Sequence, residues 1–136
     1  MKTTHVSARW TGEALNYVGS DTKGNEIPMG GNNVSPSQML LLGLAGCMGM
    51  DVVSILQKKR QTVTGVDVRV TAHQPDEYPK PYQRIEVNFT VKGSQVDPTA
   101  VARAIHLSEE KYCIVGQTLQ SEVVIEASFT LETRSD

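Results

Sequence analysis

One long apolar segment, residues 35–60, most constrains what this chain can fold into; it reads SPSQMLLLGLAGCMGMDVVSILQKKR. It opens with Ser35 and Pro36, an N-cap residue followed by a proline at the first helical position, which together signal the start of a helix. Its last residues are Lys and Arg, which the helix dipole favours in a final turn. We therefore predict a helix from Pro36 to Arg60.

The apolar residues of this predicted helix cover nearly every direction around its axis. No residue from Ser37 to Met50 is charged, so we expect burial on all sides along the first half and emergence at the polar end. Glycines at positions 43, 46 and 49 indicate close approach of another element, of this chain or of a partner chain. The apolar part is shorter than the roughly 20 residues that span a bilayer, so we expect no membrane partner.

The residues before the helix show the alternation of short strands. Apolar and polar residues alternate in Thr4–Trp10 and again in Glu13–Val18, with a Thr-Gly turn between them. Glu26–Met29 is a third short strand before a loop rich in Gly and Asn. The pattern predicts a β-meander leading into the central helix.

Two longer alternating segments follow the helix. In each segment apolar residues occupy one face and polar residues the other. The two segments are Val63–Ala72 and Arg84–Lys92. The link between them, residues 73–83, contains three prolines and is predicted as an exposed loop. We expect a pair of antiparallel strands with one wet face.

A second helix follows these strands. Asp97 and Pro98 repeat the N-cap and proline signal, and apolar residues recur at helical spacing up to Tyr112. This predicted helix, Pro98–Tyr112, places Cys113 at its C-terminal end, where we expect the thiol to be exposed and reactive.

The rest of the chain completes an α+β order. Ile114–Leu119 is predicted as a short helical turn, and Glu122–Glu132 alternates as a C-terminal strand. No repeat or linker divides the sequence, so residues 1–136 are predicted to form a single domain.

Composition narrows the function classes. A net charge of -2 gives no electrostatic reason to expect nucleic acid or an anionic membrane as partner. The N-terminal residues lack the apolar core of a signal peptide, so we expect a cytoplasmic protein whose two cysteines form no permanent disulfide. Those cysteines are then either structural residues buried in the core or reactive thiols with a function. The three histidines are scattered and no CxxC occurs, so the spacing predicts neither a metal site nor a cofactor.

At this point the residues resemble a known family. The central segment with Cys47, the later LSEEKYCIVGQTL with Cys113 and the surrounding strand pattern look like the OsmC/Ohr family, in particular its small bacterial OsmC-like members. The resemblance covers nearly the whole chain. It implies a tightly intertwined homodimer whose long, buried central helices lie between sheets, with two sites at the subunit interface.

The resemblance also implies an activity: a thiol-dependent peroxidase that reduces organic hydroperoxides in oxidative stress defence. By motif, Cys47 is the peroxidatic thiolate that becomes a sulfenic acid, and Cys113 is the resolving thiol that forms a disulfide with it. A dithiol then reduces the disulfide, and no cofactor takes part.

The sequence departs from the family pattern in three places, one of which is Ile114 directly after Cys113, where the peroxidases of the family usually have proline. The family has a glutamate just after the proline that starts the central helix, where this chain has Ser37, and an arginine in the preceding loop, where residues 19–34 contain none. The candidates for a supporting role are Ser37 itself, Arg9, Glu110 and Lys111.

Asp51, one turn beyond Cys47 on the same helix face, either hydrogen-bonds near the site or serves the structure alone. A carboxylate there would oppose formation of a thiolate.

Two alternatives to the peroxidase remain open at this stage. The first is a noncatalytic OsmC-like protein that binds a small apolar ligand at the dimer interface. The second is a purely structural dimer with buried, inert thiols, since a cysteine in an apolar helix often behaves as a small hydrophobic residue.

Overall fold

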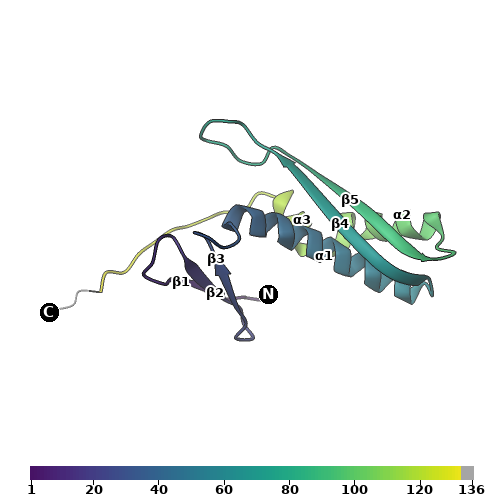
Figure 1. Cartoon of the computed structure of the whole chain (residues 1–136), viewed down its shortest axis with the longest axis horizontal. Coiled ribbons are helices and arrows are strands. Elements are labelled where there is room, and N and C mark those ends of the chain that lie inside the picture. The colour runs from purple at the N-terminus through teal and green to yellow at the C-terminus, as the bar shows by residue number, and fades with distance from the viewer. Residues whose placement is uncertain (133–136) are drawn as a thin grey trace.

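The computed structural model describes residues 1–132 and has the expected α+β order (Figure 1). A three-stranded meander precedes the central helix, an antiparallel hairpin follows it, and shorter helices come last. The elements are β1 (Ser7–Trp10), β2 (Tyr17–Ser20), β3 (Glu26–Met29), α1 (Pro36–Lys58), β4 (Thr62–His73), β5 (Arg84–Ser94), α2 (Pro98–Leu107), η1 (Ser108–Tyr112) and α3 (Ile114–Leu119).

The N-terminal meander is confirmed, with shorter strands than predicted. β1 pairs antiparallel with β2, and β2 with β3. The predicted second strand, Glu13–Val18, was wrong in its bounds because residues 11–16 form the turn, which the Thr11 N–H closes by donating to the Asn16 carbonyl oxygen at 2.9 Å. Gly30, with φ of 74°, then leads toward α1 in a conformation that favours glycine.

α1 begins where the sequence predicts and ends two residues early. The Ser35 side chain accepts a hydrogen bond from the Gln38 N–H at 3.3 Å, as an N-cap does. Arg60 takes a left-handed conformation with φ of 58°, which breaks the helical path, so the predicted end at Arg60 was wrong.

Burial along α1 differs from the prediction of a helix covered on all sides. Within this chain its buried residues form one stripe at four-residue spacing, which continues to the end of the helix: Leu44, Met48, Val52 and Leu56. The expectation of a buried first half and an emerging end was therefore wrong. The cause is that the hairpin and the later helices of one chain cover only one side of α1.

The hairpin β4–β5 confirms the predicted antiparallel pair. Val66 pairs with Val91 and Val70 with Val87, and a bulge interrupts the register between Val63 and Gly65. Its half-buried face packs over the α1 stripe and over Ala104 of α2, forming the core. Figure 1 shows the hairpin crossing the two helices, with the proline-containing link looping beyond them.

The predicted helix Pro98–Tyr112 divides into two parts. α2 ends at Leu107, and η1 continues it as a π-helical turn in which the Cys113 N–H donates to the Ser108 carbonyl oxygen at 2.9 Å. This wider turn leads directly into α3, which confirms the short helix predicted at Ile114–Leu119. π-turns inside helices are frequent at functional sites.

The predicted C-terminal strand, Glu122–Glu132, does not form in this chain. The segment has no regular secondary structure and its side chains are exposed, among them Val124, Ile125 and Phe129. Figure 1 shows it as an extended trace leaving α3. A strand needs a partner edge for its backbone groups, and among residues 1–132 no strand pairs with it.

α1 is long and apolar enough to cross a membrane by length and composition alone, contrary to the expectation from its apolar length. The core helix of a soluble protein passes the same test. α1 contacts β4, α2 and α3, and its Val52 and Leu56 are completely buried, although only 22% of its most apolar 18-residue window is buried within this chain.

Candidate functional site

Three chemically reactive side chains meet where α1 passes the start of α3. Cys47 and Asp51 stand four residues apart on α1 and so share a face, and Cys113 is the residue that caps α3. The two sulfur atoms and a carboxylate oxygen of Asp51 all lie within 4.8 Å of one another. We call Cys47, Asp51 and Cys113 the thiol–carboxylate cluster; both of its cysteines are free.

Hydrogen bonds hold the cluster in place. The Ser108 hydroxyl, which is fully buried, donates to Asp51 Oδ2 at 2.9 Å, and the Gly116 N–H donates to Cys113 Sγ at 3.2 Å. The π-helical turn from Ser108 to Tyr112 therefore fixes two members of the site: its first residue orients Asp51, and the residue after it is Cys113.

The environment of Cys113 corrects the expectation of an exposed thiol. Its side chain is 0% exposed, because the end of the π-helical turn points toward α1 and packs on Leu44 and Met48. Burial raises the pKa of Cys113 to about 11, and the neighbouring Cys47 thiol also raises it, while the Gly116 N–H acts in the opposite direction. The charge of Asp51 contributes to the same raised pKa. Cys113 is therefore a protonated thiol at neutral pH.

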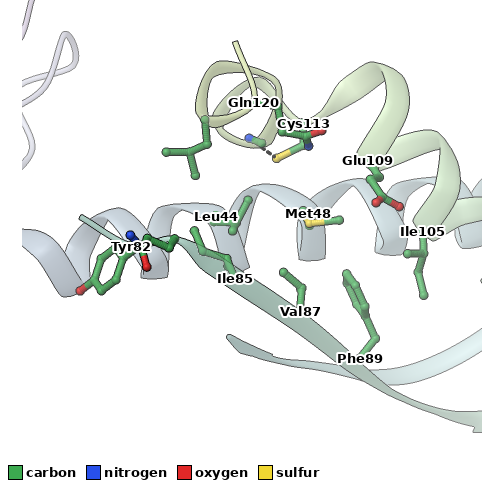
Figure 2. A pocket seen from close by; sticks show the side chains of 13 residues that line it. Leu44, Met48, Tyr82, Ile85, Val87, Phe89, Ile105, Glu109, Cys113 and Gln120 are labelled. Atoms are coloured by element: carbon green, nitrogen blue, oxygen red, sulfur yellow. Dashed lines mark hydrogen bonds between the residues drawn. The ribbon is translucent and has the colours of Figure 1, made fainter. Parts of the chain in front are cut away.

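A cavity of about 460 Å³ adjoins Cys113 between α1, β5 and the α2–α3 region. Its wall is mixed: Leu44, Val87 and Phe89 are among its apolar lining residues, while Glu109 and Gln120 add polar groups (Figure 2). A volume of this size can hold a small organic molecule.

The structure places the four supporting residues outside the cluster. Arg9 lies on β1 with a guanidinium nitrogen 4.0 Å from Glu26, and Ser37 lies in the first turn of α1 beside the Ser35 hydroxyl. Glu110 and Lys111 are exposed on η1, and the Lys111 ammonium stands over the ring of Tyr112. Among residues 1–132, no arginine or lysine forms an ion pair with Asp51.

Sequence reasoning missed Ser108 as part of the site. It is the first residue of η1 and stands 57 residues from Asp51 along the chain. No local signal in the sequence predicts that its hydroxyl meets a carboxylate of α1.

The influence of Asp51 on Cys113 gives a first prediction. In a Cys47→Ser background, where Cys113 is the remaining thiol, adding Asp51→Asn is expected to lower the pKa of Cys113 relative to Cys47→Ser alone, because it removes a negative charge beside the sulfur. The ultraviolet absorbance of the thiolate against pH measures this shift, and alkylation at mildly alkaline pH should become faster. Asp67→Asn, at an exposed carboxylate of β4, is the matched control. An unchanged or higher pKa in Asp51→Asn contradicts the prediction.

The fold and the paired thiols define a class of small α+β proteins with a two-cysteine site. Residues 29–128 match the family of OsmC-like proteins, and the chain belongs to that family. It is similar to Protein YhfA of Escherichia coli K12, with 40% identity over 125 residues that span 89% of this chain and 92% of that protein.

Two solved structures show the same fold. A hypothetical protein from Aquifex aeolicus VF5 superposes with a TM-score of 0.80 at 31% identity and covers 88% of this chain and 89% of its own. An OsmC-like hydroperoxide resistance protein from Jannaschia sp. CCS1 superposes with a TM-score of 0.59 at 18% identity and covers 85% of this chain and 83% of its own. The second likeness concerns the fold alone.

Proposed function

We propose that this protein is a thiol-dependent peroxidase that reduces organic hydroperoxides in oxidative stress defence. The observation that carries the proposal is the thiol–carboxylate cluster, in which two free cysteines from distant parts of the chain have their sulfur atoms within 4.8 Å. Membership of the OsmC-like family supports it, and a structural neighbour is called a hydroperoxide resistance protein.

The reaction assigns a different role to each cysteine. The Cys47 thiolate attacks one peroxide oxygen, the O–O bond breaks, and the alcohol leaves after taking up a proton, so Cys47 becomes a sulfenic acid. The Cys113 sulfur then attacks the Cys47 sulfur, water leaves, and a disulfide forms. A dithiol reductant returns both thiols by exchange.

The environments of the two sulfurs support this assignment. Cys47 is half-buried, and a peroxide can reach it more readily than the fully buried Cys113. The raised pKa of Cys113 keeps it protonated, which disfavours it as the first nucleophile and suits a thiol that reacts only once a sulfenic acid has formed beside it. The apolar residues of the cavity that adjoins Cys113 suit the organic group of the hydroperoxide, although Cys47 is not itself a lining residue of that cavity.

We further propose that the protein works as an intertwined homodimer. A compact monomer of 14.9 kDa exposes about 7000 Å², whereas this chain exposes 11235 Å². The excess of about 4200 Å² on each chain is more than enough to supply a large obligate interface, which buries about 2000–5000 Å² over both partners together. It includes the extended C-terminal segment and the open face of α1, where a methyl group added at Gly43 or Gly46 would meet no atom within 4 Å.

We also propose that the protein is cytoplasmic, because the reducing thiol pool of the cytoplasm would keep both cysteines free between turnovers.

The test is stoichiometric oxidation of the reduced protein with one equivalent of cumene hydroperoxide, followed by thiol counting and intact mass. The expected result is rapid loss of both thiols and a mass lower by two hydrogens, with Cys47 and Cys113 joined in the peptide map. Thiols that persist through excess peroxide would overturn the peroxidase.

A second candidate function, binding of a small apolar ligand without catalysis, is favoured by one observation. Among the described residues no cation pairs with the thiol–carboxylate cluster, while the adjoining cavity is already formed. Saturable binding of an apolar fluorophore that leaves the thiols unreactive toward peroxide would select this function. The cavity lies within one chain, so such a ligand would not need the dimer interface that the sequence suggested.

A further inference from the structure

The three members of the thiol–carboxylate cluster are also the donor types that thiophilic cations bind. A zinc ion holds sulfur at about 2.3 Å and carboxylate oxygen at about 2.0–2.2 Å, so donors on one tetrahedral ion stand about 3.5–3.8 Å apart. The sulfurs of Cys47 and Cys113 and the Asp51 oxygen lie within 4.8 Å of one another, which small side-chain rotations can close to that spacing.

The surroundings of the cluster support a ligand role for each group. The Ser108 hydroxyl occupies Asp51 Oδ2 and orients the carboxylate, so that its other oxygen can bind an ion, as outer-shell partners do in metal sites. Cys47 and Asp51 are fixed by their spacing on α1, and Cys113 is fixed by the Gly116 N–H.

The charge of the thiol–carboxylate cluster also favours a bound cation. The cluster brings together a carboxylate and two thiols that become negative when they lose their protons. Among residues 1–132 no lysine or arginine pairs with its carboxylate. Cys113 is fully buried and Asp51 is half-buried, so negative charge on the cluster needs a compensating cation. A divalent ion supplies that positive charge, and two thiolates select thiophilic ions over Mg²⁺ or Ca²⁺.

We propose that the reduced protein binds one Zn²⁺ per chain through Cys47 Sγ, Cys113 Sγ and an Asp51 oxygen, with the fourth position open to water. Two S–H bonds break, two Zn–S bonds form and two protons leave; nothing is oxidised or reduced. Zinc and hydroperoxide then compete for the same sulfurs. Only this competition rests on the proposed peroxidase, since the binding itself does not require it.

The experiment titrates the reduced full-length protein with Zn²⁺ under anaerobic conditions against a chromophoric chelator. The expected result is one zinc per chain with release of two protons at neutral pH. Zinc should also slow alkylation of both thiols, and the disulfide form should bind none. Cys113→Ser should lose the tight site, and Asp51→Asn should weaken it at least about 10-fold.

Two features keep this test decisive. Serine at position 113 can accept the same bond from the Gly116 N–H, so Cys113→Ser is expected to fold, which circular dichroism checks. Asp67→Asn and His106→Gln remove exposed donors elsewhere on the chain and should leave the zinc affinity unchanged.

Each outcome decides the proposal. No bound zinc, or zinc retained at full affinity in both Cys113→Ser and Asp51→Asn, overturns it. Zinc binding by a protein that consumes no hydroperoxide would leave the metal site standing and reject the peroxidase. Hydroperoxide consumption by a protein that binds no zinc would support the peroxidase and reject the metal site.

Discussion

Replacing Cys47 by serine is expected to lower the rate of hydroperoxide consumption by roughly 10³-fold or more. The serine hydroxyl is not ionised at neutral pH and is a poor nucleophile toward a peroxide oxygen. The remaining thiol, Cys113, is fully buried, and this burial still raises its pKa, so it does not replace Cys47. The measurement is the loss of an organic hydroperoxide with time in the presence of a dithiol reductant.

The matched variant is Cys113→Ser, which keeps Cys47 and the hydrogen bond that caps α3. It should complete a first turnover and stop at the Cys47 sulfenic acid, which a sulfenic-acid trap detects by mass. Consumption by Cys47→Ser at the wild-type rate would reject Cys47 as the nucleophile. A sulfenic acid found on Cys113 in that variant would reverse the two roles.

Replacing Met50 by glutamate is expected to convert the proposed dimer to a monomer. Met50 is 74% exposed in this chain and lies on α1 beside an open, largely apolar groove lined by Leu42, Ala45, Gly46, Gly49 and Val53. A carboxylate buried there in a dimer has no cation to pair with among the groove residues, and an unpaired buried charge costs several kcal/mol. Sedimentation velocity at micromolar concentration measures the change in mass.

Met50→Leu keeps the apolar surface and serves as the control, since it should leave the dimer intact. A dimer of undiminished stability in Met50→Glu would show that the open face of α1 is not the interface. A monomeric wild type would reject the dimer itself.

The predicted elements that depend on nearby residues agree well with the structure. The Ser35–Pro36 and Asp97–Pro98 signals set the starts of α1 and α2, because an N-cap acts on backbone groups only two or three residues away. The alternation in β4 and β5 likewise predicts which face is half-buried. These signals are local, so one sequence contains all that is needed to recognise them.

The errors arise where a residue depends on distant partners. The C-terminal segment 122–132 alternates like a strand but has no edge to pair with in this chain. The apolar surface on all sides of α1 predicts that the whole helix is buried. In this chain the hairpin and the later helices pack against one side of α1 only. Periodicity states that a face is apolar and does not state what covers it.

Local patterns were enough to predict the α+β order, the helix starts and the half-buried face of the hairpin, while the resemblance to a family singled out Cys47 and Cys113 as candidate site residues. Tertiary packing was needed to show that Cys113 is buried rather than exposed, and that its sulfur lies with the Cys47 sulfur and the Asp51 carboxylate in one cluster. This arrangement arises because the π-helical turn at Ser108–Tyr112 directs Cys113 toward α1. Packing between elements 57 to 66 residues apart creates that contact, and no spacing along the chain encodes it.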